Sequence, residues 1–207
     1  MRKSYQARGL AETDLAGDWV TQFRRWLDDA IAADLPEPNA MVLATADADG
    51  RPSARTVLLK GYDGAGLVFY TNYRSRKGRE LAANPRASAV FPWIALARQV
   101  IVTGSVEPVP ADRSDAYFAS RPHGSQVGAA ASPQSEVVPD RAALDAAWER
   151  VGALYPDGTP VPRPEHWGGY LLRPDTVEFW QGQVNRMHDR LRYRRGNGDW
   201  VVERLAP

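Results

Sequence analysis

The sequence predicts an α+β fold built mainly from antiparallel β-strands. Short apolar segments follow one another with tight turns between them, which is the pattern of β-hairpins. Helical segments do not alternate regularly with these strands, so a doubly wound parallel sheet is disfavoured. The last third of the chain returns to strands, and Asn197-Gly198 marks a hairpin turn there. We therefore expect an antiparallel sheet or barrel with helices packed outside it.

Periodicity and capping residues predict four helices. Residues 18–33 carry apolar side chains at helical spacing, Asp18 is a suitable N-cap, and Pro36 ends the pattern. Ser75 can cap a short helix through Ala83, which Asn84-Pro85 stops. The other two helices are expected over 110–120 and 140–154.

The expected strands are apolar runs bounded by turn residues. In chain order they cover 41–46, 54–60, 67–71, 87–93, 99–106, 169–172, 177–180, 189–193 and 200–204. Residues 155–167 are rich in proline and are expected to form a stiff connector inside one domain. We expect an N-terminal arm over 1–17 and a single domain over 18–207.

Composition narrows the functional classes. The 207 residues include no cysteine, which excludes disulfides, thiolate nucleophiles and cysteine–metal sites. A formal net charge of +1 gives no general attraction to nucleic acid. Neither a membrane span nor a secretory signal is visible, so a cytoplasmic location is expected. His123 and His166 have no partner at metal-ligand spacing, so no metal site is expected.

The segment 178–190 is the most informative stretch for function. Arg186, His188 and Arg190 alternate within it, and alternate side chains of an extended strand share one face. Such a face would present two fixed cations and one imidazole, which suits a phosphorylated or electron-rich ligand. An edge strand with solvated arginines is the alternative.

Cations recur at two places earlier in the chain. Arg55 and Lys60 stand at the ends of one expected strand, on opposite faces, so only a strand end or barrel rim could bring both to one ligand. Residues 70–72 and 75–77 join a strand end to a helix start, where backbone N–H groups, a hydroxyl, Arg76 and Lys77 converge. Such a junction can hold a phosphate without a glycine-rich loop. A solvated basic helix start explains it equally well.

Two polar groups follow in the middle of the chain. Tyr117, Arg121 and Ser125 are spaced by four, so on one helix they would point the same way and suit a second phosphate, although Pro122 is expected to break that helix. Gln134-Ser135 places an amide and a hydroxyl in a loop, where a turn role is the alternative.

Taken in order, these segments resemble the FMN-dependent pyridoxine/pyridoxamine 5′-phosphate oxidases over roughly residues 18–207. The resembling motifs are Arg55–Lys60, Phe69–Asn72, Ser75–Lys77, Phe91–Trp93, Arg98–Val100, Tyr117-Phe118, Ser120–Pro122, Ser125-Gln126, Gln134-Ser135, Trp167–Gly169, Glu178–Gly182, Arg186–Arg190 and Arg204–Pro207. Each motif is short, and it is the ordered set that carries the resemblance.

The resemblance implies a split β-barrel that binds FMN at a homodimer interface. Around FMN it implies Arg55, Lys60, Tyr70, Thr71, Arg76, Lys77, Gln99, Gln134, Ser135, Trp180 and Arg190. Around the substrate it implies Lys60, Tyr117, Arg121, Ser125, Arg186 and His188, with Arg186 and His188 as the catalytic pair. The implied reaction is oxidation at C4′ of pyridoxine or pyridoxamine 5′-phosphate, with O2 as acceptor and hydrogen peroxide as product.

The chain departs from the family's pattern at a few positions. Ala129-Ala130 stands where Ala-Trp is usual, and Gln183 where a small or basic residue is usual. Arg2 and Tyr5 resemble a substrate-covering Arg-x-x-Tyr. Alternative functions are a related FMN oxidase of a phenazine precursor, a non-catalytic flavin- or haem-binding barrel, and a deazaflavin-dependent reductase. Lys60, Tyr117 and Arg121 favour a phosphorylated substrate.

Overall fold

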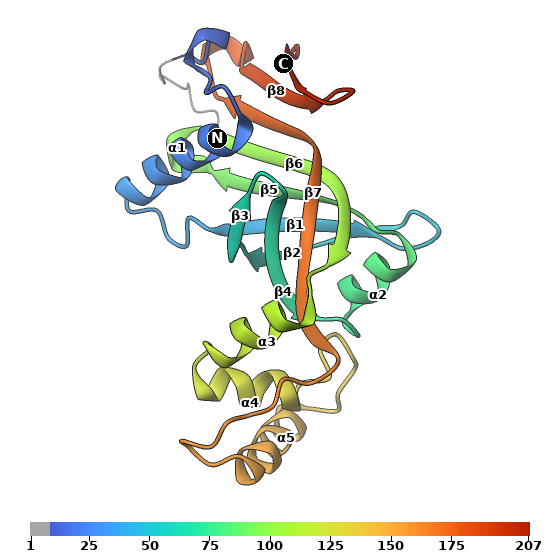
Figure 1. Ribbon diagram of the computed structural model, residues 1–207. Coiled ribbons are helices and arrows are strands. Elements are labelled where there is room, and N and C mark those ends of the chain that lie inside the picture. Colours follow the sequence, from blue (N-terminus) through green and yellow to red (C-terminus); the bar gives the residue numbers. More distant parts are fainter. Residues whose placement is uncertain (1–8) are drawn as a thin grey trace.

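The strands of the computed structural model, which describes residues 9–207, form one curled antiparallel sheet (Figure 1). The order across it is β2-β1-β5-β6-β7-β4-β3, and β8 and β9 continue from β7. The strands are β1 (Ala40–Ala46), β2 (Pro52–Leu58), β3 (Gly61–Asp63), β4 (Gly66–Asn72), β5 (Arg86–Trp93), β6 (Arg98–Pro108), β7 (Trp167–Gln181), β8 (Asp189–Arg195) and β9 (Trp200–Arg204). The prediction of an α+β fold with mainly antiparallel strands is confirmed.

Five α-helices accompany the sheet within residues 9–207. They are α1 (Trp19–Ala32), α2 (Arg76–Ala83), α3 (Ala111–Ala119), α4 (His123–Ala131) and α5 (Arg141–Leu154). The predicted caps are present: the Thr21 N–H donates to Asp18, and the Gly78 N–H donates to Ser75 Oγ. No described helix is both long and apolar enough to cross a membrane.

Helix α4 was not predicted, because its sequence is rich in glycine and alanine and gives little amphipathic signal. It begins directly after Pro122, whose fixed φ and missing N–H suit the start of a helix. The proline therefore separates two helices, α3 and α4, where the sequence predicted a helix running into a loop.

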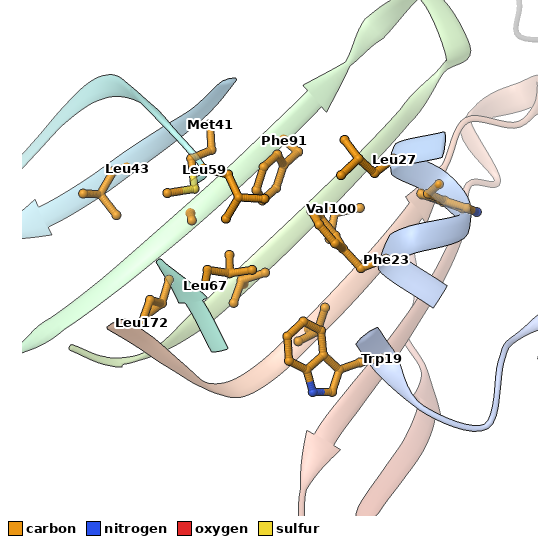
Figure 2. Close-up of a cluster of buried hydrophobic side chains, with 14 of the residues drawn as sticks. Trp19, Phe23, Leu27, Met41, Leu43, Leu59, Leu67, Phe91, Val100 and Leu172 are labelled. Carbon is orange, nitrogen blue, oxygen red and sulfur yellow. The ribbon is translucent and has the colours of Figure 1, made fainter. Parts of the chain in front are cut away.

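The main core lies between α1 and the curled sheet. Figure 2 shows Trp19, Phe23 and Leu27 of α1 facing apolar side chains of the strands, and Phe23 is fully buried with its ring 5.0 Å from that of Phe91. Each such buried aromatic or aliphatic side chain contributes roughly 1.5–3 kcal/mol to folding. This packing makes the sheet a rigid support for side chains at its ends.

Strand β7 is continuous, although two separate strands were predicted over 169–180. The reason is a β-bulge: the β6–β7 register shifts between Thr103 and Gly104, and Gly104 pairs with Pro174. Proline cannot donate a ladder hydrogen bond and is tolerated at such a bulge. A Cβ at Gly104 would overlap the Arg173 carbonyl, so the close approach here requires glycine.

A second, smaller core forms where β7 begins. Trp167 packs there with Phe118 of α3, Val127 of α4 and Val161 of the proline-rich connector. Figure 1 shows α3, α4 and α5 gathered at this end of the sheet, whereas β8 and the C-terminus lie at the opposite end. The two ends of β7 therefore have different surroundings.

Candidate active site

A cavity of about 470 Å³ lies where the ends of β2 and β4 meet α3 and α4. We call it the strand-end pocket. Its lining consists of Thr56, Val57, Leu58, Lys60, Tyr70, Thr71, Lys77, Tyr117, Arg121, Pro122, Ser125, Gln134 and Trp167. Most of the side chains predicted to bind phosphate in the first two thirds of the sequence thus meet in one cavity.

The spacing of Tyr117, Arg121 and Ser125 suggested a single helix. In the structure these residues reach the pocket from two helices and the turn between them. Tyr117 belongs to α3, Arg121 to the link and Ser125 to α4. The side-chain amide of Gln126 donates to the carbonyl oxygens of Ala119 and Arg121, at 3.2 and 2.8 Å, which fixes the link. The expected convergence holds, but its cause is the turn at Pro122.

Lys77 is the buried cation of the strand-end pocket. It is 7% exposed, and its ammonium donates to Thr71 Oγ1 at 3.1 Å and Gln134 Oε1 at 3.0 Å. Burial, together with the nearby Arg55 charge, lowers the pKa of Lys77 to about 8. Its hydrogen-bond partners are neutral, so an anion placed beside it would relieve the cost of burying its charge.

Arg55 and Arg76 both turn toward Glu80, a residue that sequence analysis missed. Glu80 is 5% exposed and lies 3.3 Å from Arg55 and 2.8 Å from Arg76. Burial alone would raise the pKa of Glu80, but hydrogen bonds from Ser53, Thr45 and Arg76, with the Arg55 charge, lower it to about 2. The four-residue spacing of Arg76 and Glu80 on a helix was the signal that could have found it.

We expect Glu80→Ala to lower the free energy of unfolding of the cofactor-free protein by about 3 kcal/mol, because it leaves the mostly buried Arg55 without its counter-ion. Denaturant titration measures this. Glu107→Ala is the matched control, since it breaks a surface pair with Arg173 and should cost less than about 1 kcal/mol. Equal costs for the two variants would contradict the prediction.

The depressed pKa of Glu80 also fixes the pH range of its contribution. A carboxyl group with a folded-state pKa below its unfolded value stabilises the fold above the unfolded value. The contribution of Glu80 is therefore present above pH 4.5 and is lost as the pH falls toward 2. The stability difference between wild type and Glu80→Gln should shrink across that window.

An aromatic stack forms one side of the strand-end pocket. The Tyr70 ring lies 3.9 Å from Tyr117 and 5.6 Å from Trp167, at interplanar angles of 17° and 11°. Gly168 and Gly169 make this packing possible, because a Cβ at either position would overlap Tyr73 or Tyr70. The two glycines of the Trp-Gly-Gly motif are thus explained, because tyrosine side chains occupy the space that their Cβ atoms would need.

Arg121 lies against this aromatic surface. Its guanidinium carbon is 4.7 Å from the Trp167 ring centre and 5.6 Å from that of Phe118. Burial lowers the pKa of Arg121. Its buried Nη1 atom has no hydrogen-bond partner within the described residues. A buried, unused donor of this kind is what an oxyanion ligand would satisfy.

Ser135 is not among the residues that line the strand-end pocket. It is exposed and adopts a left-handed backbone conformation, with φ of 73°. Its neighbour Gln134 supplies the amide oxygen that contacts Lys77 and Thr71. The predicted role of Ser135 in cofactor binding stays a prediction.

A second group of predicted residues lies at the other end of the sheet. Trp180 of β7 pairs with Gln99 of β6 on one side and with Arg190 of β8 on the other, so the three side chains share one face. Arg190 donates to both carboxylate oxygens of Glu178, at 2.7 and 3.1 Å. We call Gln99, Trp180, Arg186, His188 and Arg190 the C-terminal group.

Arg186 and His188 do not share a strand face with Arg190, so that prediction is wrong. Val184–Arg186 forms a short 3-10 turn in which Asn185 and Arg186 have φ values of 56° and 62°, and β8 begins only at Asp189. His188 nevertheless lies beside Trp180, with ring centres 4.6 Å apart. Its Nδ1 accepts a 3.0 Å hydrogen bond from the Gln183 N–H, so a neutral ring carries its proton on Nε2.

The strand-end pocket and the C-terminal group are far apart in one chain. Trp167 and Trp180 stand thirteen residues apart on the same strand, which corresponds to roughly 40 Å along its length. Figure 1 shows the two ends of β7 at opposite ends of the sheet. The other predicted residues, Arg2 and Tyr5, lie outside the described residues.

Two family models match the chain, one after the other. The model described as pyridoxamine 5′-phosphate oxidase matches residues 27–155. The model described as the pyridoxine 5′-phosphate oxidase C-terminal dimerisation region matches residues 167–207. The second match contains Trp180, Arg186, His188 and Arg190.

Similar proteins cover the whole chain. A pyridoxine/pyridoxamine 5′-phosphate oxidase of Salinispora arenicola is 63% identical over 100% of this chain and 95% of its own. The crystal structure of PhzG from Burkholderia lata with tetrahydrophenazine-1-carboxylic acid is 35% identical, covers 98% of this chain and 100% of its own, and has a TM-score of 0.90. An FMN-binding protein from Nostoc punctiforme, 18% identical over 93% of this chain and 99% of its own, shares the fold with a TM-score of 0.72.

Proposed function

The chain belongs to the pyridoxine/pyridoxamine 5′-phosphate oxidase family and is an oxidoreductase acting on these phosphorylated vitamers, and we propose that it uses FMN as cofactor and dioxygen as electron acceptor. The products are then pyridoxal 5′-phosphate and hydrogen peroxide. The observation that carries this proposal is the strand-end pocket, where the buried Lys77 and the partly buried Arg121 form no ion pair with a carboxylate within the described residues.

The charges around Lys77 fit the phosphate of FMN. Arg55, Arg76 and Lys77 supply three positive charges, and Glu80 removes one of them. The net charge of +2 that remains matches the charge of a phosphate monoester, which is roughly −1.5 to −2 at pH 7. Glu80 also keeps the two guanidinium groups together despite their mutual repulsion. A bound FMN would supply the redox chemistry, as an acceptor for the hydride from C4′ of the vitamer and a donor of electrons to dioxygen.

Lys60, Tyr117, Arg121 and Ser125 are the groups that would hold the substrate phosphate. They line the same cavity as Lys77 but approach it from the link after β2, from α3, from the turn between α3 and α4, and from α4. Charged hydrogen bonds to an oxyanion are worth about 1.5–3 kcal/mol each. That anchoring would hold the vitamer in one orientation in the pocket, so the reacting carbon meets the cofactor in a fixed geometry.

The C-terminal group would complete the site from a second copy of the chain. One chain cannot bring Trp180, Arg190 and His188 to its own strand-end pocket while β7 stays continuous and paired with its neighbours. The family's dimerisation region coincides with the segment that carries them. In a two-fold dimer the same surface acts twice, so two chains would form two equivalent sites.

Within such a site Arg186 and His188 would face the reacting end of the vitamer. Arg186 is exposed on its turn, and its guanidinium offers several N–H donors to a ligand. A neutral His188 would act as a donor through Nε2, because Nδ1 is occupied by the Gln183 N–H. Its role is then to hold the substituent at C4′ or the 3-hydroxyl oxygen of the vitamer by a hydrogen bond.

Incubating the purified protein with FMN, pyridoxamine 5′-phosphate and air tests the function directly. Formation of pyridoxal 5′-phosphate with an equal amount of peroxide is expected. Tetrahydrophenazine-1-carboxylic acid and related phenazine precursors serve as the rival substrates, since PhzG from Burkholderia lata has the same fold and was solved with this compound. Oxidation of these compounds without oxidation of either vitamer would overturn the proposal.

The affinity for FMN should fall above pH 8. Lys77 must be protonated to bind a phosphate, and its pKa in the free protein is about 8. Above that value binding has to take up a proton, so the dissociation constant should rise up to roughly tenfold per pH unit. Flavin fluorescence quenching measures this. Lys77→Arg is the matched control and should remove the slope, because its guanidinium stays charged. A slope that persists in Lys77→Arg would assign it to another group.

A further inference from the structure

Arg121 differs from Arg55, Arg76 and Arg190 in what holds it. Arg55 and Arg76 are fixed by Glu80, and Arg190 is fixed by Glu178. Within residues 9–207 Arg121 forms no ion pair, and its side chain donates no hydrogen bond to a protein group. Its guanidinium instead makes cation–π contacts with the ring faces of Trp167 and Phe118.

We propose that Trp167 is the positioning residue that holds Arg121 for the substrate phosphate. A ring face attracts a cation without using its N–H groups, which lie in the plane of the guanidinium. A carboxylate in the same place would occupy two of those donors and cancel the charge. Trp167 therefore orients Arg121 and leaves its hydrogen-bonding capacity to the ligand. The inference rests on the proposed function, because it assigns Arg121 to a phosphorylated substrate.

The surroundings of Trp167 make it a rigid support. Trp167 is 6% exposed and is the first residue of β7, where it pairs with Asn72 of β4. Its carbonyl oxygen accepts a 2.6 Å hydrogen bond from Arg163, and its ring is parallel to those of Tyr70 and Tyr117. The tryptophan is thus fixed from both backbone and ring, so the arginine above it has a defined place.

Phe118 is the second ring near Arg121, but it is the weaker support. It lies farther from the guanidinium carbon, at 5.6 Å against 4.7 Å for Trp167. Tryptophan is also the stronger cation–π partner of the two residue types. Replacing Trp167 should accordingly change phosphate recognition more than any other apolar change at this end of the sheet.

The experiment compares wild type, Trp167→Leu and Trp167→Phe, each loaded with FMN and with its flavin content measured. KM and kcat are determined for pyridoxamine 5′-phosphate and for unphosphorylated pyridoxamine, and the inhibition constant of inorganic phosphate is determined alongside. In Trp167→Leu, KM for the phosphorylated substrate and the phosphate inhibition constant should each rise about tenfold. The value of kcat should stay within about twofold of wild type, since Arg121 does not contact the reacting atoms. Trp167→Phe should recover most of the loss.

The outcomes separate the inference from the function on which it rests. A flavin-loaded Trp167→Leu protein with an unchanged KM and an unchanged phosphate inhibition constant overturns the positioning role. A KM that rises equally for pyridoxamine and its phosphate also overturns it, because that result indicates general loss of packing. If Trp167→Leu fails to load flavin, the non-aromatic variant Trp167→Met takes its place, and a phosphate inhibition constant like that of wild type in that variant overturns the role. A wild-type protein that oxidises neither vitamer phosphate refutes the proposed function instead.

Discussion

Mixing two nearly inactive variants, Arg121→Ala and Arg186→Ala, is expected to restore about a quarter of wild-type activity if the site is built from two chains. Each variant alone should lose roughly a hundredfold in kcat/KM, because each lacks one charged contact to the substrate. In a mixed dimer, one site receives the intact strand-end pocket of one chain and the intact C-terminal group of the other. Random exchange makes half of the dimers mixed, and each mixed dimer has one good site.

The same experiment contains its own control. Arg121→Ala and Lys60→Ala both damage the strand-end pocket, so every site in their mixed dimer keeps one defect and no activity should return. Activity is measured at substrate concentrations below KM after co-refolding or co-expression, with differently tagged chains to verify exchange. Recovery in the second mixture, or none in the first despite verified exchange, would refute the shared site.

Lys77→Met is expected to weaken FMN binding by about 2 kcal/mol, or roughly thirtyfold in the dissociation constant. Methionine fills a similar volume but supplies neither a charge nor a donor to the phosphate. KM for pyridoxamine 5′-phosphate, measured at saturating FMN, should change much less. Flavin content after dialysis and fluorescence titration of the cofactor-free protein provide the two measurements.

Arg79→Ala is the matched control for Lys77→Met. It removes one positive charge from the same helix, but Arg79 is exposed, pairs with Glu136 and does not line the strand-end pocket. FMN affinity should stay close to that of wild type. A similar loss in both variants would show that the total charge of α2 matters and the position of Lys77 does not.

The sequence predicted those elements that are marked by local chemistry. The caps at Asp18 and Ser75, and the hairpin turn at Asn197-Gly198, act within a few residues and were identified correctly. Helix α4 was missed because it lacks an apolar stripe, and β7 was divided because Pro174 normally interrupts a strand. The bulge that accommodates Pro174 depends on Gly104, seventy residues earlier, and no local pattern reports that pairing.

The candidate site shows the same limit. Lys60, Lys77 and Arg121 were identified from charge and spacing, and they do line one cavity. The carboxylate of Glu80 and the ring of Trp167 were not assigned a role, because their importance lies in which arginine they hold. The prediction that Arg186, His188 and Arg190 share one strand face failed because Asn185 and Arg186 form a left-handed turn. Such backbone angles are rare outside glycine, so no sequence pattern indicated them.

Strand β7 has a consequence for how the protein must be assayed. If Trp167 belongs to one active site and Trp180 to another, an isolated subunit carries one part of each of two sites and no complete site. The number of working centres then follows mass action, and dilution below the dissociation constant of the dimer should reduce turnover per subunit. Specific activity would fall with dilution while the sheet itself stays folded.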